Sequence, residues 1–329
     1  MTSAGCKTFP KFRELPMEIQ DHIWELAGHA HPHPKFYPGA QFFTIYNTIT
    51  DDDTAIAHPK TQGDPWKYRL AAPTAAVDPR APELSAYLID SGLWLACRSS
   101  YKAVGRNYMW ERTSDLKVKL ASAGTEDEGM TALWEFSLYC PREVRFEKTP
   151  DTGRSLHWAC PLVDLVVLQP HKYGSITFFE LGSYLPVMFN YPITARDLRV
   201  RDVALELRPE WIRDGRQGNE AAFTLLEGAA RWRAADWAQD IWLIDYGIKR
   251  IAGAPLRSDR RRFIGNRCRF VEVRLKDAQW EFSTVVDSYN LVRRLAIPNL
   301  QWPHRVNRFQ ESMYRQRLWG VLACVMDDE

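Results

Sequence analysis

Apolar side chains recur at helical spacing near the start of the chain. Pro16 suits the first turn of a helix, where its missing N–H leaves no hydrogen bond unmade, and Gly28 suits the position after the last turn. Between them runs one apolar stripe, formed by Leu15, Ile19, Ile23, Leu26 and Ala27. The stripe predicts an amphipathic helix that is too short to be stable alone and must dock on another element.

A second apolar stripe follows Ser91, a residue type that favours the position before a helix. Its members are Leu93, Cys97, Tyr101, Val104 and Tyr108, and the helix they predict ends near Trp110. We expect the first stripe, through Leu15, Ile19 and Ile23, to pack on the second as the core of the N-terminal region.

Other segments have the short apolar runs or the alternation of β-strands. Strands are expected at 42–49, 162–168, 200–207, 241–244 and 270–275, and a hairpin or two edge strands at 116–120 and 134–138. Helices are expected at 175–189, 219–238, 283–296 and 305–325. Strands that alternate with helices in the second half are typical of βα units and a parallel sheet.

These elements predict an α+β (mixed α/β) fold. N-terminal helices would pack with a β-rich region, and the βα units that follow would form a small, partly parallel sheet. Residues 1–8 are expected to be frayed, 9–170 to form one domain, and 171–329 to form a βα-containing region packed on it as one body.

Composition narrows the class of protein. Lys and Arg number 43 against 41 Asp and Glu in 329 residues, so the formal net charge of +2 makes nucleic acid an unlikely partner. No apolar run is long enough to span a membrane, and no leader-like segment opens the chain. Six cysteines without a C-x-x-C pair indicate reduced thiols and an intracellular protein, cytoplasmic or nuclear.

The N-terminal block has a more specific pattern. The positions Phe9, Phe12, Leu15, Pro16, Glu18, Ile19, Ile23, Trp24 and Ala27 form the motif F-x-x-F-x-x-L-P-x-E-I-x-x-x-I-W-x-x-A. This motif resembles the opening of the fungal two-EXR (F-box-like) domain family, and the segment 95–104 resembles that family's later helix. The resemblance covers residues 7–170 and implies F-box-like helices. Because the sequence also lacks a catalytic motif, we expect a non-enzymatic protein–protein interaction module of this family without a cofactor.

The Leu15-Pro16 opening also resembles an F-box helix, which grips the adaptor of a cullin ubiquitin ligase. The resemblance therefore implies a substrate adaptor as an alternative function. The candidate partner-binding residues are Leu15, Pro16, Ile19, Ile23 and Trp24. The simpler interpretation is that the stripe is core and that Trp24, at its edge, covers the strand carrying Phe43 and Ile45.

Two groups of residues have the chemistry of metal ligands. The first is His29, His31, His33 and His58, and the second is Cys140, His157 and Cys160. Each lacks a complete ligand set nearby in sequence, so we expect no metal. The sequence carries no recognised catalytic motif and we expect no enzyme, although His157, Asp164, His171 and Glu180 would be the residues of a site that spacing does not reveal.

The densest basic stretch contains Arg257, Arg260, Arg261 and Arg262. Clustered arginines bind phosphate groups or act as nuclear import signals. The alternative is a solvated loop before the strand at Phe270. Beyond the family resemblance, the sequence identifies neither a partner nor a ligand.

Overall fold

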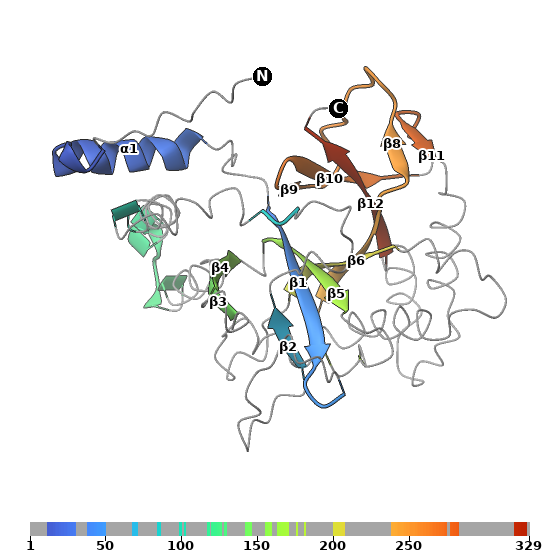
Figure 1. The fold of residues 1–329 in the computed structure, drawn as a ribbon, viewed down its shortest axis with the longest axis horizontal. Coiled ribbons are helices and arrows are strands. Elements are labelled where there is room, and N and C mark those ends of the chain that lie inside the picture. Colours follow the sequence, from blue (N-terminus) through green and yellow to red (C-terminus); the bar gives the residue numbers. More distant parts are fainter. Residues whose placement is uncertain are drawn as a thin grey trace, which may run out of the picture. The chain divides into compact units, whose positions relative to one another are not determined.

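The computed structural model describes part of the chain. The described residues are 12–30, 38–50, 68–71, 84–86, 99, 100, 102, 117, 118, 120–126, 128, 129, 142–146, 155–159, 163–170, 176, 181, 200–207, 238–274, 277–282 and 319–327. The chain divides into two compact units (Figure 1). One unit combines Met1–Phe36 with Leu88–Cys140, and the other combines Tyr37–Tyr87 with Pro141–Glu329.

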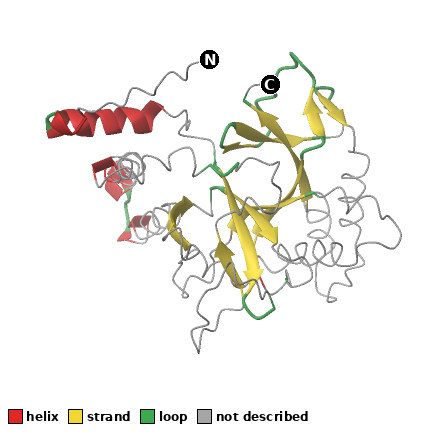
Figure 2. Cartoon of the chain, viewed as in Figure 1, coloured by secondary structure: helices red, strands yellow, loops and turns green. Residues whose placement is uncertain are grey.

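The first unit contains the 3-10 turn η1 (Phe12–Glu14) and the helix α1 (Met17–Ala30). The carbonyl of Pro16 accepts hydrogen bonds from the backbone N–H groups of Ile19 and Gln20, both at 3.0 Å, so the helix begins directly after the proline. The predicted helix is therefore confirmed, although it continues past Gly28 to Ala30. In Figure 2 it is the long red ribbon.

The second unit is built on an eight-stranded sheet with the order β2-β1-β5-β6-β7-β12-β10-β9. Its strands are β1 (Ala40–Asn47), β2 (Tyr68–Ala71), β5 (Leu165–Pro170), β6 (Val200–Glu206), β7 (Ala238–Asp245), β9 (Arg262–Gly265), β10 (Cys268–Val273) and β12 (Trp319–Met326). Strands β1, β5, β6, β7 and β12 run parallel to one another, whereas β2, β10 and β9 pair antiparallel with their neighbours. Most side chains of the parallel strands are buried on both faces, and β5 and β12 are accordingly mostly apolar runs.

Two small antiparallel sheets complete the described strands. Strand β3 (Arg142–Phe146) pairs with β4 (Ser155–Ala159), and β8 (Ile248–Arg250) pairs with β11 (Trp280–Phe282). Strand β8 also lies against β12, and Ile248 and Trp280 join a buried cluster with Val271 and Val321. The β8–β11 pair therefore covers the outer face of β10 and β12.

The large sheet curls so strongly that β9, at one end of the strand order, reaches the residues just before β1. The backbone N–H of Ile264 in β9 donates to the carbonyl of Pro38 at 2.9 Å, and Gly39 forms a parallel bridge with Ile264 just before β1. We call the concave side the inner face. It is filled by a buried cluster whose members include Phe42, Val167, Ala204, Trp242, Phe263, Phe270 and Leu322.

This architecture overturns the expected fold class. The N-terminal helices packed on a β-rich region, followed by a small sheet of βα units, are wrong: sheet predominates among the described residues, and its main part is one large curled sheet of mixed direction. The strand expected at 116–120 is also wrong, because the described residues there are helical, whereas its expected partner at 134–138 lies outside the described residues. The helix expected at 305–325 is wrong at its end, where β12 is a strand in the interior of the sheet.

Several local predictions fall on described elements. The strands expected at 42–49, 162–168, 200–207, 241–244 and 270–275 overlap β1, β5, β6, β7 and β10. The expected second helix is described only at residues 99, 100 and 102, which are helical. Most of the predicted helices at 175–189, 219–238 and 283–296 lies outside the described residues, and the division at residue 170 stays a prediction. Over the described part of the chain, no helix is long and apolar enough to cross a membrane.

Candidate functional site

Helix α1 carries the candidate partner-binding residues. Leu15 and Ile23 are half-buried, Pro16 is exposed, and the side chain of Ile19 is 47% exposed. The amide of Gln20 donates to the Leu15 carbonyl at 2.7 Å, which fixes the turn that leads into the helix. The stripe is therefore only partly covered. Its expected partners on the second stripe lie outside the described residues, so that packing stays a prediction.

Trp24 packs within its own unit. Its ring meets that of Phe12 edge to face, with 4.8 Å between the ring centroids and 61° between the planes. The indole is half-buried, and its Nε1 has no hydrogen-bond partner among the described residues. The expectation that Trp24 covers Phe43 and Ile45 stays a prediction, because those two buried residues belong to the other unit.

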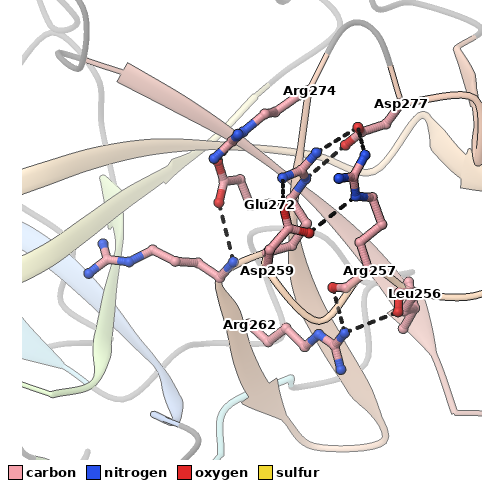
Figure 3. A network of polar contacts seen from close by, with 9 residues as sticks. Leu256, Arg257, Asp259, Arg262, Glu272, Arg274 and Asp277 are labelled. Carbon is pink, nitrogen blue, oxygen red and sulfur yellow. Dashed lines mark hydrogen bonds and ion pairs between the residues drawn. The ribbon is translucent and has the colours of Figure 1, made fainter.

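The arginine stretch forms a network of polar contacts (Figure 3). Arg260 binds Asp277 with two hydrogen bonds, from Nε at 2.9 Å and from Nη2 at 2.7 Å, and both side chains are almost fully buried. Nη1 of Arg260 donates to Asp259 at 2.7 Å. Hydrogen bonds from Arg260 lower the pKa of Asp277, so this carboxylate stays charged and holds the turn before β9 to the turn before β11.

The neighbouring arginines are engaged as well. Arg257 donates to Asp259 at 3.1 Å and lies 3.7 Å from Asp277, and Arg262 donates to the carbonyl of Arg257 at 2.7 Å. A phosphate group would have to displace these carboxylate and carbonyl oxygens. The geometry therefore favours a structural role for the stretch over the expected phosphate site, and nuclear import stays a prediction.

Arg261 points the other way, onto the inner face. One nitrogen of its guanidinium, Nη1, lies 2.5 Å from Asp202 Oδ1 on β6 and 2.6 Å from Asp240 Oδ2 on β7. Two strands, β12 and β10, separate β7 from β9 in the sheet, so the arginine reaches across the curl. Its Cζ lies 5.7 Å from the centre of the Trp242 ring, at cation–π distance. This contact fastens one end of the curled sheet to its middle.

Asp202 is the buried member of this group. It is 2% exposed and also accepts a hydrogen bond from Trp242 Nε1 at 2.8 Å. Burial raises the pKa of Asp202 to about 6, against the opposing effect of Arg261. The sequence analysis missed the group because its carboxylates stand on different strands. The available signal was an acidic residue at the third position of each of the two strands β6 and β7.

The expected metal and catalytic residues are not brought together in the described parts. His157 lies in β4 and His29 in α1, whereas His31, His33, His58, Cys140 and Cys160 lie outside the described residues. Asp164 accepts hydrogen bonds from the Gly39 backbone at 3.0 Å and from the Gln41 amide at 3.4 Å, so it holds the start of β1. His171 and Glu180 are not described. No group of three or more metal-binding side chains occurs among the residues that the structure describes.

Comparison with protein-family models, with curated proteins and with solved structures finds no match for this chain.

Proposed function

We propose that the chain is a non-enzymatic, intracellular protein–protein interaction module of the two-EXR type, and that α1 is its partner-binding element. The proposal is carried by the exposure of apolar side chains on α1: Met17 is 67%, Ile19 47% and Leu26 54% exposed. Exposed apolar side chains gathered on one element are typical of interaction sites. The Leu15-Pro16 opening and the aromatic framework support the family assignment.

The experiment compares partners captured by the wild-type chain and by the double variant Ile19→Glu/Leu26→Glu, using affinity purification from the native host and mass spectrometry. Both side chains are exposed, so the double variant should stay folded, as surface changes usually do. Glu18→Gln on the same helix is the matched control, because Glu18 is exposed and polar. We expect a protein that is captured by wild type and control and lost with the double variant. An identical set of captured proteins for all three chains would contradict the proposal.

The alternative function is an F-box-like substrate adaptor of a cullin ubiquitin ligase. Its support is the Leu15-Pro16 opening before α1, which resembles in sequence the start of an F-box helix. Mixing the purified chain with a purified cullin-ligase adaptor and measuring binding by calorimetry tests it. Binding that Trp24→Ala abolishes, with the melting temperature unchanged, would support the alternative. No heat of binding to the wild-type chain would refute it and leave the first proposal standing.

A further inference from the structure

Three polar side chains line up where parallel strands end. Thr44 in β1 is paired in register with Gln169 in β5, and Gln169 Nε2 donates to Glu206 Oε2 in β6 at 2.7 Å. By the alternation of side chains along a strand, all three share the inner face with Phe42, Val167 and Ala204. We call these three residues the carboxyl-end row. None of them takes part in the interaction surface proposed for α1.

The row has unmet hydrogen-bonding capacity. Both Glu206 oxygens are used, since Tyr246 donates its hydroxyl proton to Oε1 at 2.6 Å. By contrast, Thr44 Oγ1 and Gln169 Oε1 are buried and have no hydrogen-bond partner among the residues that the structure describes, and Thr44 is 0% exposed. Buried polar atoms of this kind are rare in folded proteins because burying them unbonded is unfavourable. Two on paired residues call for a group that binds both.

The chemistry of the row defines that group. Gln169 Oε1 can only accept a hydrogen bond, and Thr44 Oγ1 has lone pairs to offer. The adjoining Glu206 is an acid to which no basic side chain is bonded among the described residues, and each of its oxygens can accept a second hydrogen bond. A small cation with several N–H donors matches this set of two unbonded acceptors beside a carboxylate.

We propose that the carboxyl-end row binds a primary ammonium group, whose three N–H donors reach Thr44 Oγ1, Gln169 Oε1 and a Glu206 oxygen. The charge of Glu206 balances that of the ammonium, and charged hydrogen bonds of this kind are the stronger ones. The group belongs either to the ammonium ion or to the amino end of a small amine, which would enter from the carboxyl ends of the strands.

The test is the melting temperature of the full chain in ammonium, methylammonium, potassium and tetramethylammonium chloride at equal concentration. Potassium is a monovalent ion without donors, and tetramethylammonium is a cation without N–H groups. We expect wild type to melt higher in methylammonium or ammonium by roughly 2–4 °C, because a ligand that binds only the folded state raises stability. A rise in melting temperature in ammonium chloride alone would identify the free ion as the ligand. A rise in both ammonium and methylammonium chloride would identify the amino group of a small amine. The same melting temperature in all four salts would overturn the proposal. So would a rise in potassium chloride as large as the rise in the ammonium salts.

Thr44→Val supplies the second part of the test, since it replaces the hydroxyl with a methyl group of similar shape. Without a ligand the variant should melt higher than wild type, because an unbonded buried hydroxyl has been removed. It should also lose the preference for ammonium salts, which Thr44→Ser should keep. Thr50→Val is the matched control, because Thr50 is exposed just beyond β1, and it should behave as wild type. A Thr44→Val variant that melts lower in tetramethylammonium would show that a structural water already satisfies the hydroxyl, and would overturn the proposal.

Discussion

Replacing Asp202 with asparagine tests whether burial or ion pairing dominates at this carboxylate. The side chain is 2% exposed, and it is held by Arg261 Nη1 at 2.5 Å and Trp242 Nε1 at 2.8 Å. Asparagine has nearly the same shape and keeps an oxygen that accepts both hydrogen bonds. The change therefore removes the negative charge while it leaves the packing of β6 unchanged.

The expected magnitude follows from the pKa. Burial raises the pKa of Asp202 from 3.8 to about 6, and each pKa unit corresponds to about 1.4 kcal/mol. The shift of about two units therefore amounts to roughly 3 kcal/mol, of which about 2 kcal/mol falls between pH 7 and pH 4. Because the folded state holds the proton more tightly than the unfolded state, this stabilisation is present at low pH and is lost as the pH rises through 6.

Urea denaturation of wild type and Asp202→Asn at several pH values between 4 and 7 measures the effect. The free energy of unfolding of wild type, relative to the variant, should increase by about 2 kcal/mol as the pH falls from 7 to 4. Arg261→Gln is a useful companion, because loss of the guanidinium should raise the pKa of Asp202 further and move the transition to higher pH. A difference that stays constant would mean that the ion pair cancels the effect of burial, and one that increases with pH would mean that the ion pair outweighs it; either result would refute the reasoning.

Three further predictions concern single contacts. Gly320→Ala should lower the free energy of unfolding by about 1–3 kcal/mol, because its Cβ would lie 2.2 Å from the Trp242 ring; thermal melting measures this, and an unchanged melting temperature would contradict it. Arg260→Met should destabilise by about 3 kcal/mol in urea, since the buried Asp277 loses its two hydrogen bonds and, of its ion pairs among the described residues, keeps only that with Arg257 at 3.7 Å, and adding Asp277→Leu should recover most of the loss if the charge is the cause. Cys268 should react slowly with thiol reagents in the native chain, because its hydrogen bond with Cys324 and its burial raise its pKa; labelling as fast as in denaturant would refute this.

The strands were the most predictable part of the fold. The run at Leu165–Pro170 is short and mostly apolar, and a strand buried on both faces has this pattern. A uniformly apolar run was also the reason why a helix, and not a strand, was predicted at β12. Its sequence, Trp-Gly-Val-Leu-Ala-Cys-Val-Met, is apolar throughout, and such a run has no period that separates a strand from a buried helix.

The exposure of its apolar side chains explains why the strand expected at 116–120 does not form. The alternation of Val118 and Leu120 predicted a strand with one buried face, but the side chains are 69% and 37% exposed, and the described residues around them are helical. The alternation was therefore not produced by burial, and it carried no information about a sheet.

The arginine stretch shows why a site is harder to predict than a strand. The high density of positive charge was visible in the sequence, whereas the carboxylates that bind the arginines were not. Asp202, Asp240 and Asp277 come from β6, from β7 and from the turn before β11. The curl of the sheet brings Asp202 and Asp240 to Arg261, and no local pattern encodes that curl.

The position of β12 has a consequence for how the chain folds. This strand follows all the other described strands in sequence, yet it lies between β7 and β10 in the middle of the sheet. Until β12 has been synthesised and released from the ribosome, β7 and β10 both present open hydrogen-bonding edges, and open edges are templates for aggregation. The sheet can therefore be completed only after β12 is available, and we expect this step to be slow because its contacts are distant in sequence.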